Sequence, residues 1–144
     1  MKKIIIAIIV IIIIAAGYMF VRGRSTNAGQ TYTNDTYGYA ITIANGLTYR
    51  GSEDASGNFF AYDPTNANNG LTINISTPSG DETSSGATVE LNGQSAKIST
   101  FTDEKGLNRK SYQILHNGMI YEITFAPLDD PRFEAMAQSF RFTK

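Results

Sequence analysis

The sequence predicts an α+β fold, in which an antiparallel β-sheet built from hairpins is packed by a C-terminal helix and preceded by a single N-terminal transmembrane helix. Three observations predict it: an uncharged apolar stretch at the start, Asn-Gly dipeptides between segments of alternating polarity, and one amphipathic segment near the end. They divide the 144 residues into an anchor at 1–24, a linker at 25–30 and a domain at 31–144. A domain of this length can bury one core without cross-links.

The apolar stretch at residues 4–21 contains no charged residue and nine isoleucines. A helix of this length spans about 27 Å, which matches the hydrocarbon layer of a bilayer. A single segment can satisfy its backbone in lipid only as a helix. We therefore expect a lipid bilayer to hold the chain through residues 4–21. The alternative is a signal peptide cleaved near Ala15-Ala16-Gly17, although the chain stays apolar as far as Val21.

The flanks of this stretch bear on its orientation. Lys2 and Lys3 precede it and Arg22 and Arg24 follow it, so charge alone favours neither direction strongly. The preceding side is very short and the following side is long and acidic, which favours export of the domain. We expect a single-pass protein of the cell membrane, with a cytoplasmic N-terminus and an extracytoplasmic domain. Residues 25–30 are small and polar, and about eight residues of such chain reach only about 15 Å.

The composition beyond the anchor excludes several classes of protein. From Ser25 onward the chain has 8 basic and 13 acidic residues, a net charge of −5, which does not suit binding to nucleic-acid phosphates. The absence of Cys excludes disulfides, thiol catalysis and Cys-ligated metals, and a single His excludes multi-His metal sites. We expect no cofactor, no metal and no nucleic-acid partner.

The clearest hairpin is predicted at residues 110–125, around Asn117-Gly118. Asn-Gly favours the positive φ angles of a two-residue turn. Such a turn predicts three opposing pairs on the core face: His116 with Met119, Ile114 with Tyr121, and Tyr112 with Ile123. Phe125 shares that face. The alternate side chains, which are mostly polar, face the other way: Ser111, Gln113, Glu122 and Thr124.

A second hairpin is predicted at residues 88–98, around Asn92-Gly93. Its apolar side chains share one face: Val89, Leu91, Ala96 and Ile98. Its polar side chains share the other: Glu90, Ser95 and Lys97. Further strands are expected at three β-rich segments, 39–43, 58–62 and 71–76. Residues 78–86 are expected to form an exposed loop, and residues 103–106 an exposed turn.

One helix is expected in the domain, beginning at Pro131. Asp130 can cap its first turn, proline suits the first helical position, and Glu134 lies near the positive end of the helix dipole. Apolar residues recur at helical spacing and form one stripe that can cover the sheet: Phe133, Met136, Ala137 and Phe140. Residues 140–142 then predict a short final strand.

Several segments resemble PsbP-like domains. Tyr37-Gly38-Tyr39 is similar to the aromatic-Gly-aromatic strand that opens those domains, and residues 91–96 are similar to their mid-chain hairpin. Residues 118–125 resemble the strand before their last helix, and residues 133–142 resemble that helix with its Ser-Phe-x-Phe ending. The resemblance covers most of residues 31–144 and rests on structural residues.

This resemblance implies a trimmed version of the family's α/β/α sandwich. Region 78–86 is too short for the helix that many members place there, and Ala44 and Leu47 replace the usual Pro and Trp. Most members act as binding or stabilising modules. No motif supports transfer of photosystem or Ran binding to this chain, and a fold does not determine function.

Two features of the sequence suggest a catalytic or a metal site, and each has a simpler structural interpretation. His116 is the single histidine of the chain, the residue type most often used in acid–base catalysis, but it lies beside a turn without a nucleophile-elbow sequence, so we expect a strand-end residue and no catalytic residues. The segment Asp63 to Gly70 is Asn-rich like a calcium loop, but Thr65 and Ala67 occupy ligand positions. We expect a turn that leads into the following strand.

Phe59 and Phe60 are adjacent aromatic residues in a predicted strand, so they must face opposite sides of the sheet. One of them is expected either to be covered by a loop or helix or to belong to a binding patch. Asp81-Glu82 is expected at a loop tip and Asp129-Asp130 at the helix cap. Asn34-Asp35-Thr36 and Asn74-Ile75-Ser76 match glycosylation acceptors, a pattern short enough to arise by chance.

These observations favour a non-enzymatic, membrane-anchored extracytoplasmic domain that binds or stabilises a protein partner at the envelope. The alternative is a small-ligand or lipid-binding envelope domain, in which sheet and helix enclose an apolar pocket. The sequence identifies neither the partner nor the binding residues.

Overall fold

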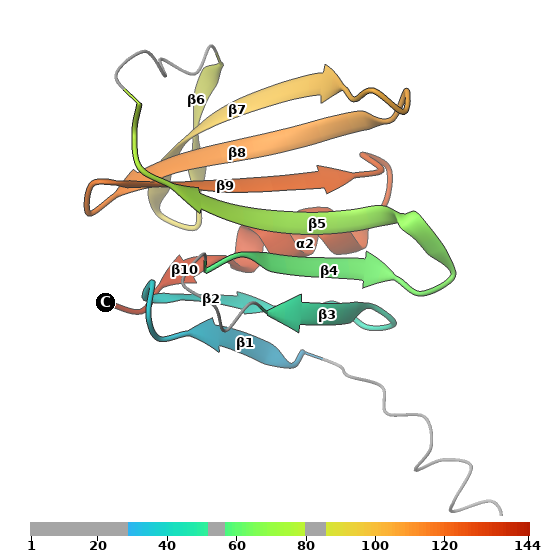
Figure 1. The fold of residues 1–144 in the computed structure, drawn as a ribbon, viewed down its shortest axis with the longest axis horizontal. Helices are drawn as coiled ribbons and strands as arrows, with labels where there is room; N and C mark the ends of the chain where they lie inside the picture. The colour runs from blue at the N-terminus through green and yellow to red at the C-terminus, as the bar shows by residue number, and fades with distance from the viewer. Residues whose placement is uncertain (1–28, 52–56, 80–85) are drawn as a thin grey trace, which may run out of the picture.

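The computed structural model of the chain describes residues 29–51, 57–79 and 86–144 (Figure 1). The predicted membrane helix at 4–21, the predicted linker up to residue 28 and Asp81-Glu82 lie outside the described residues. The described part contains one helix, α2 (Pro131–Ser139), and the following strands: β1 (Thr31–Asn34), β2 (Tyr39–Thr42), β3 (Thr48–Gly51), β4 (Phe59–Asp63), β5 (Asn66–Ser76), β6 (Ala87–Leu91), β7 (Gln94–Thr102), β8 (Asn108–His116), β9 (Met119–Ala126) and β10 (Arg141–Phe142). In this part of the chain no helix is long and apolar enough to cross a membrane.

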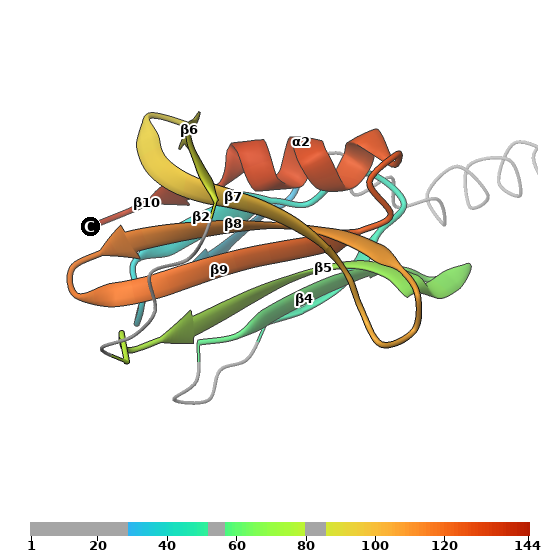
Figure 2. The ribbon, with the colours of Figure 1, turned by 90° about the horizontal axis from the view of Figure 1, so that it is seen from above.

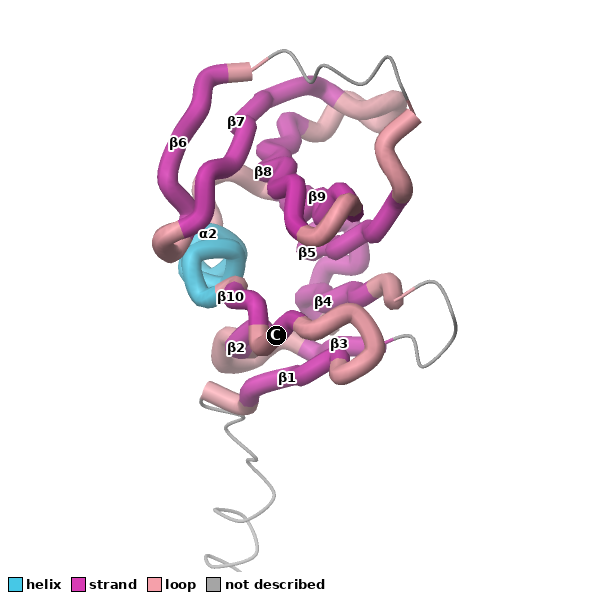
Figure 3. The backbone as a smooth tube through the Cα atoms, turned by 90° about the vertical axis from the view of Figure 1, so that its left-hand side faces the viewer, coloured by secondary structure: helices cyan, strands magenta, loops and turns pink. Residues whose placement is uncertain are grey.

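The strands form two antiparallel sheets. The large sheet has the order β3-β4-β5-β9-β8-β7-β6, and the small sheet has the order β1-β2-β10. Seen along the strands in Figure 3, β5, β9, β8, β7 and β6 follow an arc, so that β6 lies beside α2. The predicted fold class is confirmed at this level, as a mostly antiparallel β structure with one C-terminal helix.

Both predicted hairpins are confirmed, including their registers. Ile114 lies opposite Tyr121 and Tyr112 opposite Ile123, while Val89 lies opposite Ala96. The turns have the expected left-handed conformation, with φ of 48° at Asn92 and 50° at Asn117, each followed by a glycine. The type of turn therefore determined both pairings locally.

The prediction of a turn at residues 63–70 is wrong for most of its length. β5 already begins at Asn66, and Asn69-Gly70 lies inside the strand. Gly70 pairs with Tyr62 on one side and with Ala126 on the other. This pairing on both sides of Gly70 outweighs the turn preference of Asn-Gly. The register shift between Tyr62 and Asp63 takes up the extra chain length.

The core lies between the large sheet on one side and α2 with the small sheet on the other (Figure 2). Phe133, Met136 and Ala137 of the helix are buried against the sheet, as the helical spacing predicts. We call the side of the large sheet that faces α2 the core face and the opposite side the open face. Buried side chains of the core face come from every central strand: Phe59, Leu71, Ile73, Tyr112, Ile114, Tyr121, Ile123 and Phe125.

The helix begins as predicted. Oδ1 of Asp130 accepts a hydrogen bond from the backbone N–H of Arg132 at 3.0 Å, and Pro131 is the first helical residue. The predicted final strand is β10, which pairs with β2 at Tyr39 and Ala40. β1 and β3 were not predicted, because both are short and polar; each pairs with the strand that follows it, β1 with β2 and β3 with β4.

Candidate functional site

The open face of the large sheet is the candidate site, because α2 and the small sheet lie on the other side. Phe59 is 2% exposed in the core, whereas its neighbour Phe60 is 37% exposed on the open face. The alternation predicted for this pair is confirmed, and Phe60 is the member that leaves the core. In the described part of the chain, α2 and the small sheet cover only the core face of the large sheet.

The side chains at the centre of the open face are polar, and several of them form hydrogen bonds within the sheet. Ser111 is buried and donates from its hydroxyl to Oε1 of Glu122 at 2.9 Å. The hydroxyl of Thr72 donates to the backbone carbonyl of Thr124 at 3.4 Å. A polar row crosses this part of the sheet at matching register positions: Asn74, Glu122, Gln113, Lys97 and Thr88. The apolar side chains of the open face lie outside this centre.

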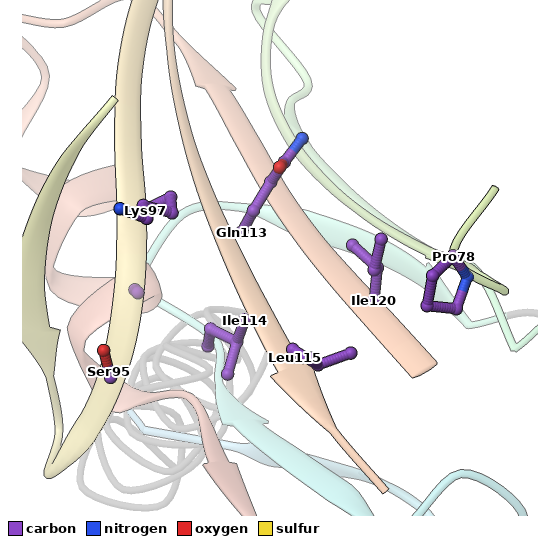
Figure 4. Close-up of a pocket in the computed structure, with 8 residues that line it drawn as sticks. Pro78, Ser95, Lys97, Gln113, Ile114, Leu115 and Ile120 are labelled. Carbon is purple, nitrogen blue, oxygen red and sulfur yellow. The ribbon is translucent and has the colours of Figure 1, made fainter. Parts of the chain in front are cut away.

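A hollow of about 340 Å³ opens where β8 ends and β9 begins. Leu115 and Ile120 lie opposite each other in adjacent strands, and Pro78 approaches from the segment after β5. Figure 4 shows Lys97 and Gln113 on neighbouring strands at the polar side of this hollow. The Leu115 side chain is 67% exposed, although it is large and apolar. We call this feature the Leu115 hollow.

Sequence reasoning placed Gln113 on this face but did not identify the hollow. The available signal was a break in alternation, since Leu115 and Ile120 are apolar at positions of the predicted hairpin where polar residues are expected. Pro78 could not be found in this way, because only the path of the chain after β5 brings it to Ile120.

A second hollow, of about 210 Å³, lies beside Phe60 near the turn between β7 and β8. Gly70 and Thr72 of β5 line it, and Lys105 and Arg109 line it from the turn and β8. The nearest carboxylate to Arg109 is Asp103, at 2.7 Å from its Nε. Hydrogen bonds hold the pKa of Asp103 below its ordinary value, that from the backbone of Leu107 most of all, with a further one from Arg109.

His116 packs against the C-terminal end of the chain. Its ring is stacked on Phe142 with 3.6 Å between centroids and 10° between planes, and its Nε2 lies 3.4 Å from the carbonyl oxygen of Lys144. Asn117 contacts the same nitrogen at 3.1 Å. His116 therefore packs against β10 and the residues after it.

Both carboxylate oxygens of Asp63 accept hydrogen bonds from other residues of the domain. Its Oδ1 accepts from the backbone N–H and the hydroxyl of Thr65, and its Oδ2 accepts from Nη2 of Arg132 at 2.6 Å. The hydrogen bond from the Thr65 hydroxyl and then that from Arg132 lower the pKa of Asp63 to about 2. Among the described residues no group of three or more His, Cys, Asp or Glu side chains could hold a metal ion.

The two glycosylation patterns differ in their surroundings. The Oδ1 of Asn34 accepts a hydrogen bond from the backbone of Tyr37 at 3.0 Å, and Asn34 is buried. Asn74 is exposed on the open face.

Asp130 caps α2, as expected, and its pKa is lowered chiefly by the hydrogen bond from the Arg132 side chain.

Comparison with known proteins bears on the fold. No family model matches the sequence, and no curated protein matches it. The structure is similar to a crystal structure from Bacteroides thetaiotaomicron VPI-5482, with a TM-score of 0.57, 15% identity and coverage of 81% of this chain. This chain spans only 49% of that one.

The structure is also similar to the solution structure of cyanobacterial PsbP (CyanoP) from Synechocystis sp. PCC 6803. The TM-score is 0.47 and the identity is 15%, over 83% of this chain and 95% of that chain. At 15% identity, each of these two similarities concerns the fold alone.

Proposed function

We propose that this protein is a non-enzymatic, membrane-anchored extracytoplasmic module that binds a protein partner through the Leu115 hollow. The observation that carries the proposal is the exposure of Leu115 beside Ile120 in an otherwise polar part of the sheet. Exposed apolar side chains that line a hollow and are rimmed by polar groups are typical of interaction sites. The packing role of His116 also fits a module whose task is binding.

The chemistry of the hollow specifies the kind of partner segment that fits. Leu115, Ile120 and Pro78 offer an apolar wall for one side chain of the partner. Lys97 lies on the polar side, and its Nζ donates to the hydroxyl of Thr88 at 2.9 Å. It forms no ion pair among the described residues, so its charge can attract a carboxylate. We therefore expect a segment with an apolar side chain next to Asp or Glu.

The anchor and linker support a partner at the envelope. A hydrophobic segment at 4–21 and a short polar tether would keep the domain within about 15 Å of its point of attachment. Binding to a neighbour in the same membrane then benefits from a high effective concentration. Modest contacts in the hollow can therefore suffice.

A small apolar ligand is the second candidate for the same hollow. Its volume of about 340 Å³ falls at the lower end of the range typical of small-molecule sites. A ligand that is retained in a native mass spectrum of the full chain, and that is lost in Leu115→Asp, would favour this candidate over a protein partner.

Site-specific crosslinking in native membranes tests the proposal. A photoreactive amino acid is placed at Leu115 and, as a matched control, at Ala135, which is exposed on α2. The proposal predicts one adduct of defined mass from position 115 and none from position 135. The crosslinked peptide of the partner should carry an apolar residue beside Asp or Glu, and Lys97→Glu should reduce the yield. Equal adducts at both positions, or none at 115, would contradict the proposal.

A further inference from the structure

The second hollow, beside Phe60, lies at the opposite end of the open face. Arg109 and Leu115 are six residues apart on β8, which corresponds to about 20 Å along a strand. We call the hollow lined by Phe60, Asn68, Gly70, Thr72, Lys105 and Arg109 the Phe60 hollow. It combines an aromatic ring, uncharged polar side chains and two cations, whereas the Leu115 hollow is lined by one cation and no aromatic ring.

The aromatic wall is held in place by its neighbours. The ring of Phe60 is stacked on Tyr62, with 5.3 Å between centroids and 15° between planes. Its edge lies above Gly70, where a Cβ atom would be only 2.9 Å from Phe60 and from the carbonyl oxygen of Ala61. The glycine therefore provides the room in which the ring lies across β5. Such a ring offers a flat apolar surface to a ligand.

The cationic wall is organised by Asp103. Its Oδ1 accepts from the backbone N–H groups of Lys105 and Leu107, both at 2.9 Å, and its Oδ2 accepts from Nε of Arg109. The turn is thereby fixed, and Asp103 engages Arg109 through Nε. In the described part of the chain, the terminal guanidinium nitrogens of Arg109 and the Nζ of Lys105 form no hydrogen bond or ion pair.

The charge of this hollow contrasts with that of the domain. The chain beyond Ser25 has a net charge of −5, yet Lys105 and Arg109 both line this one hollow. Of the two carboxylates in the turn, Asp103 is occupied by its hydrogen bonds and Glu104 is exposed at the tip. Two nearby cations with unused donors complement a carboxylate, and arginine can bind one in bidentate fashion.

We infer that the Phe60 hollow binds a carboxylate carried on a six-membered ring. The flat side of the ligand ring lies on Phe60, and the carboxylate contacts Arg109 and Lys105. Ring hydroxyls reach Asn68 and Thr72. Gly70 and Thr72 of β5 are paired on both sides, with β4 and β9, so their backbone groups are not available to an extended peptide and side chains must recognise the ligand there. A uronate unit of an acidic polysaccharide and a free aromatic carboxylate share this chemistry.

The test is a titration of the full chain in detergent, followed by backbone amide NMR. Tetragalacturonate is the probe, maltotetraose is its neutral counterpart, benzoate represents the free aromatic carboxylate, and hexaglutamate represents an acidic peptide. The inference predicts saturable shifts at Phe60, Asn68 and Lys105 with tetragalacturonate. Maltotetraose and hexaglutamate should each bind at least about tenfold more weakly. Tighter binding of benzoate at the same amides would support the site and identify the free carboxylate as its ligand.

Two variants and one control make the result specific. Lys105→Gln and Phe60→Leu should each weaken tetragalacturonate binding by about fivefold or more, with an otherwise unchanged spectrum. Arg141→Gln, which alters an exposed cation of the small sheet outside both hollows, should leave binding within about twofold. The inference is overturned if hexaglutamate binds as well as tetragalacturonate, if Lys105→Gln has no effect, or if no probe saturates. Because the Leu115 hollow is not involved, none of these results bears on the crosslinking test.

Discussion

The hydroxyl of Tyr112 on β8 donates a hydrogen bond of 2.6 Å to Oε1 of Glu134 on α2. The same carboxylate accepts from Nζ of Lys110 at 2.7 Å and from Nε2 of Gln138 at 3.1 Å. Burial acts to raise the pKa of Glu134, but the hydrogen bonds from Lys110 and Tyr112 outweigh it and lower the pKa. Burial, and then this hydrogen bond, raise the pKa of Tyr112. The contact therefore ties the helix to the sheet through a charged acceptor.

Tyr112→Phe should lower the free energy of unfolding by about 1 to 2 kcal/mol, because a hydrogen bond to a charged group is lost while the ring remains packed. Urea denaturation at pH 7 measures the change. Glu134→Gln and the double variant complete a mutant cycle, with an expected coupling of about 1 kcal/mol. Strictly additive losses would show that the bond contributes nothing beyond packing.

Asp63 should make the protein sensitive to acid. Its pKa in the folded state is about 2, which is below the value of about 4 for an unfolded chain. The stabilisation is therefore complete above pH 4 and is lost as the pH falls from about 4 towards 2. Asp63→Asn should be less stable than the parent at pH 7, and the difference should shrink towards pH 2. Thermal unfolding across this range measures it, and the exposed Asp35→Asn is the control; a constant difference would contradict the assignment.

Ile123→Ala should lower the free energy of unfolding by about 2 to 5 kcal/mol, because Ile123 is fully buried at the centre of the core face. Ile120→Ala, three residues earlier on the open face, should cost about 1 kcal/mol or less. The pair removes the same atoms from opposite faces of β9. Denaturation midpoints with unchanged slopes provide the measurement. Equal losses would mean that the open face is as well covered as the core.

Protease added to intact cells should remove the domain, since we expect the N-terminus in the cytoplasm and residues 31–144 outside. The remaining fragment should stay with the membrane after washing with salt and carbonate. Cleavage of the chain before purification, detected as a mature N-terminus near residue 18, would instead support the signal-peptide alternative. Complete protection of the domain would contradict the proposed orientation.

The sequence by itself determined those features whose causes are local. Asn92-Gly93 and Asn117-Gly118 impose left-handed turns, and alternation then assigns each side chain of two hairpins to a face. Asp130 and Pro131 begin α2, and the helical spacing of Phe133 and Met136 selects its buried stripe. In each case the residues that interact are close together in the chain.

Only the tertiary structure decided the features that depend on distant partners. Asn69-Gly70 has the same dipeptide as the hairpin turns, yet it is extended because β4 and β9 pair with both sides of β5. The hollow beside Phe60 requires the turn that carries Lys105 to lie near β5, and the Leu115 hollow requires Pro78 to reach Ile120. The free energy of such contacts comes from long-range pairing and burial, and the local preferences of a short segment carry no information about it.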